Sequence, residues 1–217
     1  MRTSAITLFL LSLAVPAALA ARGDRLTDAT DVLTEMAGNF DSGIPKDLFS
    51  KAECVVIIPG VKKGAIGFGG QYGRGYMACR NKNGWSAPSG VRIEGGSIGF
   101  QIGGSSTDVI LLVMNDRGVD KLLGSKFTIG ADAAIAAGPL GRQASAQTDA
   151  TMHAEMLAWS RSRGVFAGVS LQGSTLRTDS AENKQLYGKD LSARDIVRGG
   201  IAPPAAASGL MAVLSKY

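Results

Sequence analysis

The clustering of glycine is the feature that most constrains how this chain can fold. The sequence has 29 glycines, and six fall within twelve residues: Gly64, Gly67, Gly69, Gly70, Gly73 and Gly75. Glycine destabilises a helix interior by roughly 1 kcal/mol per residue, so this composition argues against a helical bundle. In a strand, glycine marks a bulge, a bend or a close approach of another backbone. The cluster therefore predicts a sheet that curls sharply.

Apolar runs on either side of this cluster predict the strands of that sheet. Residues 54–58 form a buried-strand pattern that we expect to stop at Pro59-Gly60, and residues 108–114 form a second one. Further strands are predicted at 64–72, 74–80, 90–102, 127–137, 143–159 and 165–177. Asn83-Gly84 is a hairpin turn signal.

Helical patterns are confined to the two ends of the chain and to short connections. Residues 27–37 have apolar side chains at helical spacing and an acidic polar face. Short helices are expected after Pro45, around 119–123, at 181–187 and 192–197, and at 206–216. The fold class is therefore β-rich α+β: a strongly twisted, glycine-rich antiparallel sheet, sandwich or barrel with short flanking helices.

The N-terminus has the three parts of a secretory signal peptide. Arg2 is the positive region, Ile6 to Leu13 the apolar region, and Ala18-Leu19-Ala20 an A-x-A cleavage site. We expect residues 1–20 to be removed and the protein to be exported, periplasmic or secreted. The expected order is then signal peptide 1–20, acidic helix and linker 21–43, main domain 44–200, and C-terminal tail or helix 201–217.

Cys54 and Cys79 are the two cysteines of the chain, and both lie in predicted strands. In an oxidising compartment they could pair, which would contribute roughly 3 kcal/mol in the chain-entropy model. They could equally remain buried free thiols. The sequence leaves both readings open.

Motifs for chemistry are weak. Gly95-Gly96-Ser97-Ile98-Gly99 matches G-x-S-x-G, which in hydrolases places a serine nucleophile between a strand and a helix. Here a strand-like, glycine-containing segment follows Ser97, so a serine hydrolase is the least favoured reading. One histidine and two separated cysteines do not make a usual zinc set. Residues 73–78 match the dinucleotide-binding pattern G-x-G-x-x-A, but that pattern needs a helix to start there and the segment reads as a strand. We expect no enzyme activity and no cofactor.

Basic side chains flank the first predicted strands and are the candidate binding residues. They are Lys51, Lys62, Lys63, Arg74, Arg80 and Lys82. A basic surface is attracted to anionic headgroups by about 1 kcal/mol per residue near the membrane. An ordinary solvated face is the alternative. Nucleic acid is not expected, because the strands offer few aromatic side chains for base stacking.

Several motifs, in order, resemble the SYLF domain family. The resemblance runs from about Pro45 to Gly199. Its segments are Lys51 to Pro59, Gly70 to Gly75, Gly84-Trp85-Ser86-Ala87-Pro88-Ser89, Gly99 to Gly104, Thr107-Asp108, Gly130-Ala131-Asp132, Gly138-Pro139-Leu140-Gly141-Arg142 and Ser160 to Gly173. The pair W-S-A-P-S and G-P-x-G-R is the most specific part.

The resemblance implies a lipid-binding module, known from yeast actin-patch proteins and from secreted bacterial single-domain proteins. It implies binding to acidic phospholipids, with phosphoinositide headgroups and a basic N-terminal helix in eukaryotic members. Residues 27–37 are acidic and depart from that pattern. We therefore expect Lys51, Lys62 and Lys63 to contact an anionic membrane. Actin is an implausible partner for an exported chain, and the alternative function is a structural or interaction module that binds an envelope protein.

Overall fold

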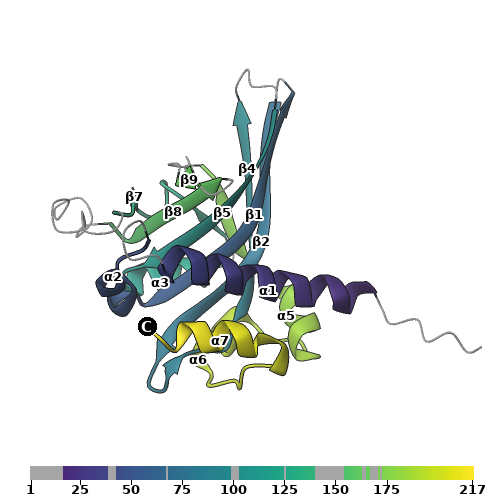
Figure 1. Cartoon of the computed structure of the whole chain (residues 1–217), viewed down its shortest axis with the longest axis vertical. Helices are drawn as coiled ribbons and strands as arrows, with labels where there is room; N and C mark the ends of the chain where they lie inside the picture. Colours follow the sequence, from purple (N-terminus) through teal and green to yellow (C-terminus); the bar gives the residue numbers. More distant parts are fainter. Residues whose placement is uncertain are drawn as a thin grey trace, which may run out of the picture.

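The computed structural model describes residues 17–38, 43–66, 68–98, 103–124, 126–139, 154–162, 165–166, 171 and 173–217. A curled, half-barrel sheet with short helices forms the molecule, which confirms the predicted α+β class (Figure 1). The strands are β1 (Cys54–Ile66), β2 (Phe68–Asn81), β3 (Gly84–Trp85), β4 (Ser89–Ile98), β5 (Gly103–Val113), β6 (Phe127–Thr128), β7 (Ile135–Ala137), β8 (Met156–Ser162), β9 (Val165–Phe166) and β10 (Thr175–Thr178). The helices are α1 (Ala17–Gly38), α2 (Lys46–Lys51), α3 (Asp116–Leu122), α5 (Ser180–Tyr187), α6 (Ala193–Arg198), the 3-10 helix η2 (Ala205–Ala207) and α7 (Ser208–Leu214).

The described strands lie in the order β6-β10-β4-β2-β1-β5-β8-β7, with β3 paired to β2 and β9 paired to β8. Every described strand pair is antiparallel except β7 with β8, which is parallel. The prediction of an antiparallel sheet is thus right for the central strands, and one edge departs from it. The strands expected at 127–137 and 143–159 are shorter, and residues 143–153 lie outside the described part of the chain.

Both faces of the sheet are buried, which explains why β1 and β5 contain uninterrupted apolar runs. Val55 and Ile57 pack in a core with α1, α2 and α7. Val56 and Ile58 face the opposite core, which includes residues of α3 and α6. A strand covered on both faces needs apolar residues at every position, and alternation is lost for that reason.

Helix α1 lies across one face of the sheet and packs against α7 (Figure 1). Its apolar stripe, Leu26 to Ala37, is buried, whereas Asp28, Asp31 and Glu35 are exposed. The predicted helix at 27–37 is confirmed, and it begins earlier, at Ala17. Leu210 and Leu214 of α7 share its core. Among the described helices, none is long and apolar enough to span a bilayer.

The expected stop at Pro59-Gly60 is wrong, because β1 continues through it as a β-bulge. Between Ile57 and Lys62 the register with β2 gains one residue, and Gly60 has a φ of 55°. The amide of Gly60 donates to Asp108 of β5. A bulge bends its strand and increases the local twist.

Two glycines of β2 make room for this bulge. A Cβ on Gly75 would collide with the carbonyl of Ile57, and one on Gly73 would lie 2.9 Å from side-chain atoms of Ile58 and Val61. The glycine cluster therefore marks a close approach of two backbones, as the sequence predicted. It does not interrupt β2, which is one continuous strand where two had been expected.

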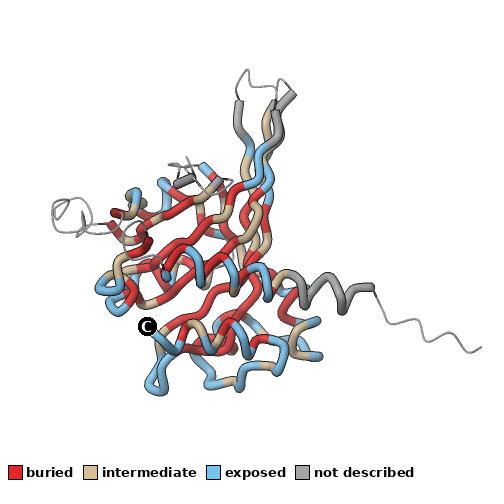
Figure 2. The backbone as a smooth tube through the Cα atoms, in the orientation of Figure 1, coloured by how far each residue is buried: buried red, intermediate tan, exposed pale blue. Residues whose placement is uncertain are grey.

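Beyond the bulge, four strand ends extend past the body of the molecule. We call residues 62–66, 68–72, 94–98 and 103–106 the sheet arm; they belong to β1, β2, β4 and β5. Figure 1 shows the arm projecting alone at the top of the view. Its described side chains are mostly exposed or half-buried, whereas the same strands are buried within the body (Figure 2).

Candidate functional site

The six predicted basic residues do not form one site. Lys62 is opposite Tyr72 in the β1–β2 register, and Lys82 follows ten positions later along the chain of β2. At about 3.3 Å per residue, the two lysines lie roughly 30 Å apart. Lys51 ends α2, beside the start of β1, and so belongs with Lys82 at the body end of the sheet.

Lys62 and Lys63 are the two predicted residues that lie on the sheet arm. Lys62 is exposed and Lys63 is half-buried. Directly opposed residues of antiparallel strands project from the same face, so Lys62 and Tyr72 are neighbours. Tyr72 is 49% exposed and is the one large apolar side chain that is exposed in the described part of the chain. An exposed cation beside an exposed aromatic ring therefore marks this face of the arm.

The carboxylate opposite Tyr72 is already neutralised. Glu94 is opposite Tyr72 in the β2–β4 register. It forms ion pairs with Arg92 at 2.8 Å and with Arg177 at 3.8 Å. No ion pair of Lys62 or Lys63 is found among the described residues, and the arm thus presents positive charge.

Arg74 has a structural role instead. Its Nε donates to Asp179 at 2.7 Å, and a terminal nitrogen lies 2.6 Å from Asp179 and 3.4 Å from Glu182. Burial lowers the pKa of Arg74, but the hydrogen bond and charge of Asp179 and the charge of Glu182 raise it, and the net shift is upward. Its guanidinium is occupied by two buried carboxylates.

The same carboxylates join α1, β2 and α5. Tyr76 donates to Glu182 at 2.7 Å, and Arg25 of α1 reaches the other oxygen of Glu182 at 2.7 Å. Burial, followed by the hydrogen bond to Glu182, raises the pKa of Tyr76 above its ordinary value of 10.0. Asp179 also caps α5 by accepting from the amide of Glu182.

Arg80 also makes structural contacts within the fold. Its guanidinium stacks 4.1 Å from the centroid of the Trp85 ring and donates to the carbonyls of Phe49 and Tyr217, at 3.2 and 2.7 Å. Burial lowers its pKa, although Glu53 opposes the shift. Arg80 therefore fastens α2 and the end of the chain to the sheet, and it is not a surface cation.

Cys54 and Cys79 form a disulfide. They are directly opposed in the β1–β2 register, at the body end of these two strands. Both cysteines are buried. The hairpin formed by β1 and β2, including its part of the sheet arm, is therefore closed covalently at its base.

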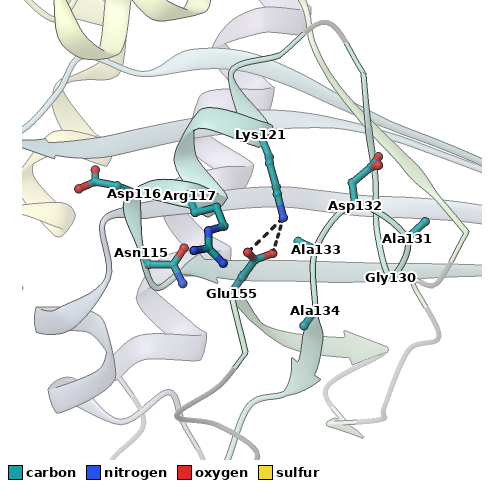
Figure 3. Close-up of a pocket in the computed structure, with 10 residues that line it drawn as sticks. All are labelled: Asn115, Asp116, Arg117, Lys121, Gly130, Ala131, Asp132, Ala133, Ala134 and Glu155. Carbon is teal, nitrogen blue, oxygen red and sulfur yellow. Dashed lines mark hydrogen bonds and ion pairs between the residues drawn. The ribbon is translucent and has the colours of Figure 1, made fainter.

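A cleft of about 790 Å³ lies at the body end of β5, beside α3. In Figure 3, Lys121 points to Glu155 and holds both of its oxygens, at 2.9 and 3.1 Å, while Asp132 points away from the pair. Arg117 lies beside Glu155 and is exposed. The cleft combines cations and carboxylates, and the described residues of its lining include no serine, cysteine or histidine.

The backbone placement of Ser97 differs from that of a nucleophile elbow. Ser97 lies in β4, opposite Gly69 of β2, and the next described element is strand β5. A nucleophile elbow requires a helix directly after the serine, and four residues separate the two strands here. No group of metal-binding side chains is found in the described residues.

Sequence reasoning missed Tyr72 and the Asp179–Glu182 network. Tyr72 precedes Gly73 inside the glycine cluster. It lies beyond the bulge, in the part of the sheet that the sequence pattern did not predict, because Pro59-Gly60 had been taken as the end of the strand. Arg74 and Asp179 are 105 positions apart, so no local pattern joins them. The capping position of Asp179 before the predicted helix at 181–187 was the one available signal.

Comparison with known proteins supports the resemblance read from the motifs. Residues 94–217 match the Ysc84 family, described as Las17-binding protein actin regulator. An SH3 domain-containing protein of Schizosaccharomyces pombe is 40% identical over 178 residues, 80% of this chain and 41% of that protein. LAS seventeen-binding protein 3 of Saccharomyces cerevisiae is 36% identical over 182 residues, 81% of this chain and 39% of that protein.

The human SH3 domain-containing YSC84-like protein 1 is 34% identical over 179 residues, 82% of this chain and 52% of that protein. The chain thus spans about half the length, or less, of these curated relatives. The family match also extends to residue 217, past the limit at Gly199 read from the motifs. The fold, the motifs and the family match agree, and the chain belongs to the Ysc84 family, whose shared unit is the SYLF domain.

Proposed function

We propose that this chain is a non-enzymatic module that binds the surface of an anionic phospholipid membrane through the sheet arm. Lys62 and Lys63 contact phosphate groups, and Tyr72 lies at the level of the headgroups. The observation that supports this is the pairing of exposed Lys62 with exposed Tyr72 on a projecting part of the sheet. Tyrosine is enriched where an apolar phase meets water.

The charge of the arm agrees with this proposal. Glu94 is paired with Arg92, so it does not offset the lysines. Each lysine near an anionic surface contributes about 1 kcal/mol of attraction. Two lysines give weak binding, and several copies or an additional contact would strengthen it.

The proposal differs from the attachment implied for eukaryotic members, which use a basic N-terminal helix. Here the apolar face of α1 is buried against the sheet, and its exposed residues include three carboxylates, Asp28, Asp31 and Glu35. Over residues 25–38, whose side chains are described, the helix has no free apolar face for a bilayer. The arm is the alternative contact that remains.

We also propose that the chain works outside the cytosol, after removal of residues 1–20. Cleavage after Ala20 would leave the described buried stripe of α1, Leu26 to Ala37, intact. The disulfide between Cys54 and Cys79 agrees with an oxidising compartment.

Co-sedimentation with vesicles tests the proposed function. The protein is mixed with phosphatidylcholine vesicles that contain or lack phosphatidylglycerol. We expect binding only to the anionic vesicles, weakened by salt. Lys62→Gln combined with Lys63→Gln should lower the partition coefficient about thirty-fold, which corresponds to about 2 kcal/mol.

The matched control is Lys51→Gln combined with Lys82→Gln. It removes the same charge at the body end of the sheet, and we expect it to bind nearly as the wild type does. Equal losses in the two double variants would point to net charge and would contradict an arm-specific site. Binding to neutral vesicles that salt does not weaken would contradict the electrostatic contact.

A protein-binding module is the second candidate. The names of the family and of the Saccharomyces cerevisiae relative refer to Las17 or LAS seventeen binding. The cleft beside α3, with exposed Arg117 and Asp132, is the candidate surface. An envelope protein captured by the wild type but not by Arg117→Glu, together with no vesicle binding, would favour this function over the first.

A further inference from the structure

The outer end of the sheet arm is apolar in sequence. In the β1–β2 register the last pair is Ile66 with Phe68, and in the β2–β4 register Phe68 is opposite Ile98. One register row thus contains two isoleucines and a phenylalanine from three neighbouring strands. The next row inward has only small residues in these strands: Ala65, Gly69 and Ser97.

This row lies farther from the body than the lysines do. Ile66 is four positions beyond Lys62 on β1, which amounts to roughly 13 Å along the strand. The headgroup region of a bilayer is roughly 5–8 Å thick on each side of the hydrocarbon. An arm whose lysines meet the phosphates therefore has the length to reach the upper acyl chains with its last row.

Hydrogen bonding limits how deep the arm can go. Within the arm, β1 and β2 are paired on both sides. The outer edge of β4 is paired with β10 only at Glu94, opposite Thr175, and no strand partner is found beyond it or along residues 103–106 of β5 among the described residues. Unpaired backbone groups are costly in hydrocarbon, so an open sheet edge does not enter it far. A contact of about one register row suits this arm.

We infer that the arm inserts the row of Ile66, Phe68 and Ile98 just below the headgroups of an anionic bilayer. This inference rests on the proposed function and adds the apolar half of the contact. The lysines and Tyr72 set the orientation and level of the arm, and the row beyond them adds a contact that salt does not screen. Insertion is shallow and reversible, because only strand ends take part.

Quenching by brominated lipids tests the depth. Phe68→Trp places a fluorophore in the last row, and Asn83→Trp places one in the exposed turn after β2, at the opposite end of that strand. Wild-type Trp85 and Trp159 are buried and give the background signal. Anionic vesicles with bromine near the headgroup or deep in the acyl chain are compared with unbrominated ones.

We expect the Phe68→Trp emission to be quenched, most strongly by bromine near the top of the acyl chains, while Asn83→Trp behaves as the background does. Ile98→Trp is a second probe in the same row, should Phe68→Trp fail to fold. Phe68→Ser should lower binding at least tenfold and make the remainder more sensitive to salt.

The outcomes separate the two proposals. If the variants sediment with anionic vesicles but neither Phe68→Trp nor Ile98→Trp is quenched, insertion is wrong and the electrostatic contact stands. If the wild type sediments with no vesicle, the proposed function itself is wrong and insertion is excluded with it. Equal quenching of Asn83→Trp and Phe68→Trp would contradict the proposal that the arm end of the molecule enters the membrane.

Discussion

At the scale of single residues, the six predicted basic side chains carry the same formal charge but have different roles. Arg74 and Arg80 were grouped with four lysines because all six flank the first strands. The guanidinium has five donors in a fixed plane and suits buried acceptors, whereas the ammonium is strongly hydrated. Asp179 and Glu182 take up Arg74, and two backbone carbonyls take up Arg80. The lysines are left at the surface.

The buried tyrosine beside Glu182 predicts a loss of stability at high pH. The pKa of Tyr76 is raised in the folded state, so above about pH 10 the unfolded chain ionises this group while the folded protein does not. Stability is then fully present below that pH and falls as pH rises further. The free energy of unfolding by urea, measured between about pH 8 and about pH 11, should decline in the wild type.

Tyr76→Phe should flatten that decline and lower stability at pH 8 by about 1 kcal/mol, through the lost hydrogen bond to Glu182. Burial also raises the pKa of Tyr187, so part of the decline should persist until Tyr187→Phe is added. Parallel curves for the wild type and the double variant would contradict this account.

At the scale of elements, the bulge in β1 and the glycines opposite it shape the sheet. The sequence predicted the curl from the glycine cluster, and this prediction is confirmed. It failed at Pro59-Gly60, which was taken as a strand end. Proline lacks a donor and glycine weakens pairing, so a stop is the local expectation. The flanking strands instead pair on both sides of the extra residue, and Asp108 accepts the freed amide of Gly60.

Gly75→Ala should destabilise the protein by about 1–3 kcal/mol, because the new methyl group would collide with the carbonyl of Ile57. Gly96→Ala is the matched control, since its added methyl group has no neighbour within 4 Å and the residue is exposed. Its effect should stay within about 0.5 kcal/mol. Urea denaturation compares the two, and similar losses would show that the close approach at Gly75 is not the constraint.

At the scale of the whole molecule, the sheet has a covered body and a bare arm. The class, the N-terminal helix and the apolar segments of β1 and β5 could be predicted, because hydrophobic period is local, whereas the ends of the strands up to β5 could not. The division of the basic residues between the two ends of the sheet could not be predicted. It depends on how far β1 and β2 continue beyond the bulge in β1. The joining of α1 and α7 in one core also required the fold.

The mass of the exported protein tests compartment and disulfide together. Expressed with its own N-terminus in a bacterial host, the chain should be recovered from the periplasm or medium without residues 1–20. Its mass without reductant should be lower by two hydrogen atoms than after reduction, because Cys54 and Cys79 are joined. A product that keeps residues 1–20 and stays in the cytosol would contradict export.

The disulfide has a further consequence when the chain meets a protease. The bond spans the hairpin from Cys54 to Cys79, and the exposed part of that hairpin lies between the two sulfurs. A protease that cuts the chain once there opens a ring without dividing the molecule. The two pieces stay tethered at the base, and each strand keeps its neighbours in the body. A single cut among the exposed residues of the hairpin therefore leaves the rest of the fold joined and able to persist.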